Sequence, residues 1–139
     1  MTMDFKYPKH EKLKSKKTID SLFAAGRSVS KFPLRLVFVP SDYGLDLSKN
    51  QNLKMGVSVS KKNFKKAVDR NYFKRLLREA YRLNKHILTD NLEKPMAMML
   101  FYQTKERLNF QEINEKTIQL FEKFMAQTKA DATIKNLQS

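Results

Sequence analysis

The basic segment Lys61–Lys85 contains the side chains best suited to chemistry with a polyanion. It reads KKNFKKAVDRNYFKRLLREAYRLNK and holds ten lysines and arginines against two acids, a net charge of +8. The whole chain of 139 residues has a formal net charge of +14, so more than half of the excess lies here. Because binding of Lys and Arg to phosphates releases condensed counterions, nucleic acid is the favoured partner.

Most of this segment is predicted to form one amphipathic helix, residues 67–87. At about 100° per residue, one arc is apolar and is expected to face a core: Tyr72, Phe73, Leu76, Ala80, Leu83 and Ile87. The opposite arc is polar: Arg70, Asn71, Lys74, Arg75, Arg78, Arg82 and Lys85. Like charges one turn apart repel each other, so a row of phosphates explains this arc better than an ordinary solvated face. Charge alone leaves RNA, DNA and acidic protein open.

The sequence does not supply the residues that a nuclease needs. Phosphodiester cleavage calls for clustered carboxylates that hold metal ions, or for histidines that act as acid and base. The acids are scattered, His10 and His86 lie far apart, and there is no cysteine. We therefore predict neither catalytic residues nor metal ligands in this protein. A membrane-surface protein is disfavoured because the chain has no Trp and no apolar run long enough to span a bilayer.

The basic helix is expected to belong to one α+β domain of residues 1–127. Apolar residues at helical spacing predict a short helix over residues 18–25, which Gly26 ends. Strands are predicted at residues 32–39, 53–59 and 96–102, and a last helix through residues 113–124. Residues 1–12 are expected to be flexible and residues 128–139 to form a polar tail. The absence of cysteine and of a signal segment favours a soluble, cytoplasmic protein.

The basic helix resembles one known family, the protein component of bacterial ribonuclease P. Its signature is an Arg-Asn pair followed by Lys-Arg and Arg-Glu on one helix, as in Lys66–Asn71, Lys74-Arg75 and Arg78-Glu79. The strand and the Lys61-Lys62 pair before the helix fit the same pattern, and so do Phe23, Gly26 and Arg27 near the first helix. Lys65 stands where many members have Gly. The resemblance covers roughly residues 13–124.

This resemblance implies a fold and a function that spacing alone does not. The fold would be an α/β sandwich of order αββαβα with a small extra strand and a left-handed β-α-β crossover, against the usual right-handed rule. The protein would bind the catalytic ribonuclease P RNA, as a monomer within the ribonucleoprotein, and promote removal of the 5′ leader from precursor tRNA. Mg²⁺ would be bound through the RNA. The alternatives are a ribosomal or other structured-RNA-binding protein and a DNA-binding nucleoid protein.

The resemblance also assigns residues to two RNA-binding sites. The catalytic RNA would contact Lys61, Lys62, Lys66, Arg70, Asn71, Lys74, Arg75, Arg78 and Arg82. The 5′ leader would lie in a cleft with Phe23 and with one face of the strand at residues 32–39, where Arg35 is the favoured candidate. Arg35 and Val37, or instead Leu34, Leu36 and Phe38, could form that face. Without the resemblance, Phe23 is better explained as a core side chain, whereas for Asn71 a helix-surface hydrogen bond and a contact with RNA explain the residue equally well.

Overall fold

The computed structural model describes residues 19–20, 22, 24, 26–40, 53–90 and 96–138 of the chain. Of residue 40 and residues 129–138 only the backbone is described. The predicted flexible start at residues 1–12, the loop at residues 41–52 and Phe23 lie outside the described residues. Of the predicted first helix, Ile19, Asp20, Leu22 and Ala24 are helical. Gly26 follows them, and its N–H donates to Leu22 O at 2.9 Å.

Four strands form one mixed sheet, with the order β1-β2-β4-β3. The strands are β1 (Arg27–Lys31), β2 (Leu34–Pro40), β3 (Leu53–Val59) and β4 (Met96–Tyr102). β2 pairs antiparallel with both β1 and β4, whereas β3 and β4 are parallel. A parallel pair needs a crossover connection, and α2 (Ala67–Asn84) with α3 (His86–Thr89) supplies it. The left hand of this crossover stays a prediction.

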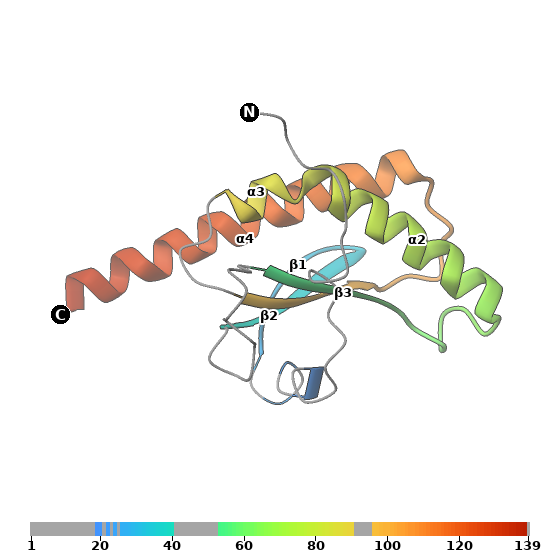
Figure 1. Ribbon diagram of the computed structural model, residues 1–139, viewed down its shortest axis with the longest axis horizontal. Coiled ribbons are helices and arrows are strands. Elements are labelled where there is room, and N and C mark those ends of the chain that lie inside the picture. The colour runs from blue at the N-terminus through green and yellow to red at the C-terminus, as the bar shows by residue number, and fades with distance from the viewer. Residues whose placement is uncertain are drawn as a thin grey trace.

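Helix α2 and the helices that follow it cover one face of this sheet (Figure 1). There α2, α3 and α4 (Phe110–Gln138) enclose the main core. Alternate strand residues point into it, as Leu53, Met55 and Val59 of β3 do. The other face carries a smaller apolar cluster of Leu22, Val37, Val39, Ala97 and Met99. β4 is therefore buried on both faces, which explains its unbroken apolar sequence MAMMLFY.

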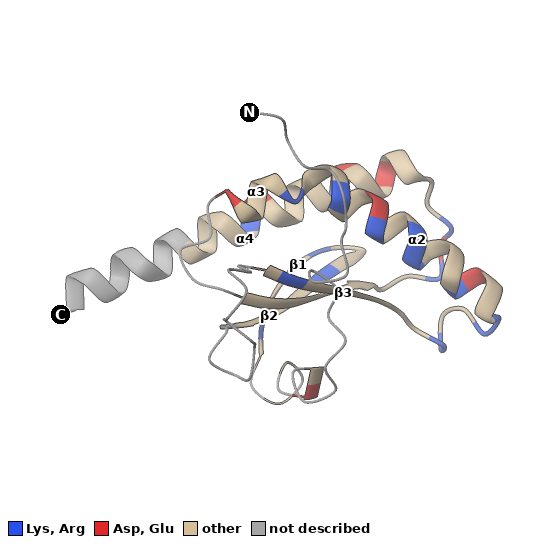
Figure 2. Cartoon of the chain, viewed as in Figure 1, with Lys and Arg blue, Asp and Glu red and all other residues tan. Residues whose placement is uncertain are grey.

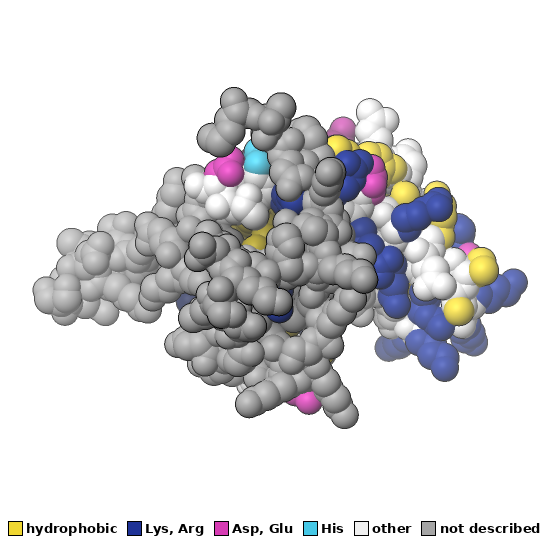
Figure 3. Space-filling view, viewed as in Figure 1, with side chains coloured by type: hydrophobic (Ala, Val, Ile, Leu, Met, Phe, Trp, Pro, Cys, Tyr) yellow, Lys and Arg dark blue, Asp and Glu magenta, His cyan; other side chains and the backbone are white. Residues whose placement is uncertain are grey.

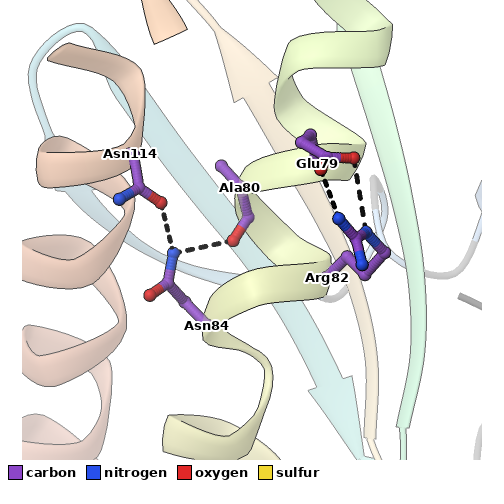
Figure 4. A network of polar contacts seen from close by, with 5 residues as sticks. All are labelled: Glu79, Ala80, Arg82, Asn84 and Asn114. Carbon is purple, nitrogen blue, oxygen red and sulfur yellow. Dashed lines mark hydrogen bonds and ion pairs between the residues drawn. The ribbon is translucent and has the colours of Figure 1, made fainter. Parts of the chain in front are cut away.

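Polar contacts fix α2 against α4 at the end of the basic helix. Asn84 is 7% exposed, and its side-chain amide donates to Ala80 O at 2.8 Å and to Asn114 Oδ1 at 2.7 Å (Figure 4). A buried amide needs such partners, because an unpaired one would cost about 1–3 kcal/mol. This contact joins residues 30 positions apart and sets the distance between the two helices.

The structure changes three of the predicted element boundaries. β2 begins at Leu34 and not at residue 32, because Phe32 and Pro33 form the turn between β1 and β2. The basic helix ends at Asn84, and α3 follows it after Lys85. α4 extends to Gln138, so the predicted polar tail has a helical backbone. The small extra strand that the resemblance implies corresponds to β1.

Candidate nucleic-acid interface

Several lysines and arginines of the predicted interface lie along α2 (Figure 2). Asn71, Arg75 and Arg78 are exposed there, and Arg70 and Lys74 are half-buried beside them. Among the described residues, neither Arg75 nor Arg78 has an ion pair or a side-chain hydrogen bond. Lys61, Lys62 and Lys66 are exposed in the turn that enters the helix. The structure thus brings these residues together along one helix and the turn before it.

The buried face of α2 is rotated relative to the predicted one. Leu77 and Tyr81 are fully buried, whereas Tyr72, from the predicted apolar arc, is 42% exposed. Lys85, from the predicted polar arc, is only 5% exposed. The predicted apolar and polar arcs were wrong at these positions because α2 packs against both the sheet and α4. The sequence alone does not indicate from which side α4 contacts α2. Val68, which is 76% exposed, lies with Tyr72 on the outward side.

Arg70 has a structural contact as well as a place in the interface. Its Nη1 donates to Phe64 O at 2.9 Å and to Lys65 O at 2.7 Å. Phe64 in turn is buried against Phe73, with ring centroids 4.7 Å apart. These contacts hold the backbone of the turn while Lys65 and Lys66 stay exposed. Arg70 therefore shapes the surface that its neighbours present.

Arg82 differs from the other predicted RNA-binding cations because it is paired within the helix. It binds both carboxylate oxygens of Glu79, with Nε 3.3 Å from Oε2 (Figure 4). The hydrogen bond and the charge of Arg82 lower the pKa of Glu79, and Glu79 raises the pKa of Arg82. Both groups are therefore charged near neutral pH. Glu79 offsets part of the positive potential at this end of the face, so Arg82 offers less net attraction to phosphate than Arg75 or Arg78.

The loop between β4 and α4 adds a cation that the sequence interpretation missed. Arg107 donates to Asp69 Oδ1 at 3.2 Å, and its guanidinium lies 5.2 Å from the ring centroid of Phe73. It also lies 6.0 Å from the ring centroid of Tyr72. Asp69 and Arg107 are 38 positions apart, so no local pattern indicated this contact. Arg107 therefore joins this loop to α2, while Asp69 offsets part of its charge, as Glu79 does for Arg82.

Tyr102 binds two backbone groups of the same loop. Its hydroxyl donates to Glu106 O and accepts from Leu108 N, the latter at 3.1 Å. Burial raises the pKa of Tyr102, which keeps the hydroxyl protonated and able to donate. The loop that carries Arg107 is therefore fixed to the end of β4.

Arg35 lies on the sheet face opposite α2 and α4. Leu34, Leu36 and Phe38 point into the main core, and Val37 belongs to the smaller cluster on the other face. Alternation along β2 places Arg35 on the same side as Val37. Its Nη2 donates to Ser28 Oγ at 3.4 Å, and the side chain is half-buried. The sequence left open which face of this strand could form the leader cleft. The face with Leu34, Leu36 and Phe38 packs into the main core, whereas the face with Arg35 lies outside it.

Within residues 19–20, 22, 24, 26–40, 53–90 and 96–138, no group of three or more His, Cys, Asp or Glu is placed to hold a metal ion. In the same part of the chain, no helix is long and apolar enough to cross a membrane.

The fold and this surface define a basic α+β protein with a cationic helix on one side of a mixed four-stranded sheet. The family model described as "Ribonuclease P" matches residues 7–125. The chain therefore belongs to the ribonuclease P protein family.

Relatives of this chain carry the name ribonuclease P protein component. One from Porphyromonas gingivalis is 43% identical over 90 residues, which are 64% of this chain and 62% of that protein. The match thus spans less than two thirds of the Porphyromonas protein. One from Dictyoglomus thermophilum is 29% identical over 119 residues, 86% of this chain and 92% of that protein.

Solved structures show the same fold at low sequence identity. The RNase P protein of Staphylococcus aureus aligns with a TM-score of 0.63 at 18% identity, over 81% of this chain and 93% of that one. The RNase P protein of Thermotoga maritima aligns with a TM-score of 0.62 at 24% identity, over 81% and 96% of the two chains. These likenesses confirm the α+β fold class that the resemblance implied.

Proposed function

We propose that this chain is the protein subunit of ribonuclease P, which binds the catalytic RNA and promotes removal of the 5′ leader from precursor tRNA. The observation that carries the proposal is the α2 face, where Arg75 and Arg78 are exposed and unpaired among the described residues of a family member. Arg offers planar, bidentate donors to phosphate. The half-buried Lys74 adds a mobile point charge beside them.

In this proposal the turn and the helix contact the RNA together. Lys61, Lys62 and Lys66 approach the RNA backbone before the helix begins, and Asn71 offers both a donor and an acceptor to a ribose, a base edge or a metal-bound water. Arg70 contributes by holding the turn, through Phe64 O and Lys65 O.

Chemistry in this complex belongs to the RNA and to Mg²⁺ bound through its phosphates. The protein's cations would reduce the repulsion between the RNA strands and so favour metal binding between them. The complex would act in the cytoplasm with one copy of the chain per RNA.

Cleavage should depend entirely on the RNA subunit. We expect protein freed of RNA by nuclease treatment to leave precursor tRNA intact, since no residue set in the sequence suits hydrolysis. Reconstitution with ribonuclease P RNA from Porphyromonas gingivalis and Mg²⁺ should yield leader removal at lower salt and Mg²⁺ than the RNA alone requires. Leader removal by the RNA-free protein would refute the proposal.

A structured-RNA-binding protein without a catalytic complex is the second candidate, because the basic α2 face would also suit ribosomal RNA. RNA recovered with the purified protein separates the two candidates. A single large species that cleaves precursor tRNA supports ribonuclease P, and ribosomal RNA alone supports the alternative.

We further propose that the 5′ leader contacts Phe23 and the sheet face that carries Arg35. Phe23→Ala should weaken binding of precursor tRNA by the reconstituted complex about 5- to 150-fold, because an unpaired base stacks on an aromatic ring with ~1–3 kcal/mol. Arg35→Ala should lower the magnitude of the log-log salt slope of that binding by the amount expected for about one phosphate contact. Mature tRNA, which lacks the leader, serves as the control and should bind both variants as tightly as wild type. A folded Phe23→Ala protein that still prefers precursor tRNA to the same degree would place the leader elsewhere.

A further inference from the structure

The turn between β1 and β2 exposes a large aromatic ring that neither core cluster uses. Phe32 is 71% exposed, although the sequence placed it in an apolar strand. Tight hairpin turns favour Gly, Asn and Asp, which adopt the turn conformation and tolerate water. An exposed phenyl ring forgoes the stabilisation that burial would give. The position of Phe32 therefore calls for an explanation outside the fold of the free chain.

Hydrogen bonds hold this turn in place from two sides. Pro33 is buried, and its carbonyl accepts from Gln103 N at 2.8 Å. The carbonyl of Ser30 accepts from Lys123 Nζ of α4, also at 2.8 Å. The ring of Phe32 thus projects from a backbone that is already ordered. Little conformational entropy would be lost if a partner bound to it.

The strand register places Phe32 on the same rim of the sheet as the basic turn that enters α2. Leu34, which follows the turn, pairs with Tyr102, and Tyr102 pairs with Val59. Neighbouring strands are about 4.8 Å apart, so β2 and β3 are separated by about 10 Å at this end. The chain segments leaving these strand ends carry exposed cations, namely Lys31, Lys61, Lys62, Lys65, Lys66, Lys105 and Arg107. Figure 3 shows Lys and Arg side chains gathered at the end of the molecule where α2 begins.

We propose that Phe32 is a stacking contact for an unpaired nucleotide of the ribonuclease P RNA, an inference that rests on the proposed function. An aromatic ring among cations suits single-stranded RNA, because the ring stacks on a base while the cations bind the flanking phosphates. The RNA subunit is favoured over the leader because Phe32 shares its rim with Lys61 and Lys62. Arg35, the leader candidate, lies instead on the face of the sheet.

Phe32→Trp tests the contact directly, because the chain has no other Trp. The fluorescence of the introduced tryptophan should be quenched when the Porphyromonas gingivalis ribonuclease P RNA is added. Later addition of precursor tRNA should change this fluorescence little. Gln119→Trp, at an exposed position of α4, is the matched control and should not be quenched. Quenching only after precursor tRNA is added, or equal quenching of both variants, would overturn the proposal.

Phe32→Ala separates stacking from charge. Affinity for the same RNA should fall about 5- to 150-fold, with an unchanged salt slope, since a phenyl ring releases no counterions. Lys31→Ala should instead lower the magnitude of that slope by about 0.7–0.9. Both variants should unfold at the wild-type temperature because both side chains are exposed. Wild-type affinity in Phe32→Ala would refute the stacking contact alone, whereas a wild-type protein that fails to bind the RNA would refute the proposed function and this contact with it.

Discussion

Phe73→Ala should lower the free energy of unfolding by about 3–5 kcal/mol, the cost of truncating a fully buried Phe. Phe73 is 0% exposed and lies at the centre of an aromatic cluster beneath α2. Its ring stacks on Tyr102 with centroids 4.9 Å apart and contacts Phe64 at 4.7 Å. Because Arg107 also lies over this ring, the cavity would loosen both the helix and the loop beside it. Urea denaturation of the free protein measures the loss.

Tyr72→Ala is the matched control, since it truncates the next aromatic residue of the same helix. Tyr72 is 42% exposed, so its removal should cost less than about 1 kcal/mol. Equal losses of unfolding free energy at the two positions would contradict the orientation of α2 found in the structure. They would favour the apolar arc predicted from the sequence, which contains both residues.

The secondary structure followed closely from local patterns in the sequence. The alternation of Leu53, Met55, Val57 and Val59 predicted a half-buried strand, and β3 confirms it, although Val57 is only partly buried. The apolar run at residues 96–102 predicted a strand, which β4 confirms, and the 3.6-residue period predicted α2. These patterns succeed because each reports burial on a regular backbone period.

The features that the sequence did not predict depend on contacts between distant segments. The orientation of α2 depends on its contacts with α4, and the spacing of apolar residues within α2 does not indicate where α4 lies. The contact of Asp69 with Arg107 spans 38 residues, and Phe32 is exposed because the chain turns there. Arg70 was expected to bind RNA only, but its bonds to Phe64 O and Lys65 O arise from the path of the turn. Such contacts appear only once the elements pack.

Arg75 and Arg78, which have no ion pair or side-chain hydrogen bond among the described residues, give the sharpest test of RNA binding. The double variant with Arg75→Ala and Arg78→Ala should lower affinity for ribonuclease P RNA about 15- to 30-fold at 0.15 M salt, assuming one phosphate contact for each side chain. The log-log salt slope should fall in magnitude by about 1.4–1.8. Stability should change little, because both side chains are exposed and Arg78 has only like-charged residues among its charged neighbours one turn away. A filter-binding titration at several salt concentrations measures both quantities.

The matched control removes the same charge from another helix. The double variant with Lys116→Ala and Lys129→Ala also lowers the net charge by two, but its positions lie on another helix, α4. If the RNA docks on α2, this control should keep most of the wild-type affinity and slope, because charges farther from the phosphates than about 10 Å are largely screened. Equal losses in the two double variants would mean that the RNA responds to net charge alone. The α2 face would then have no special role in binding.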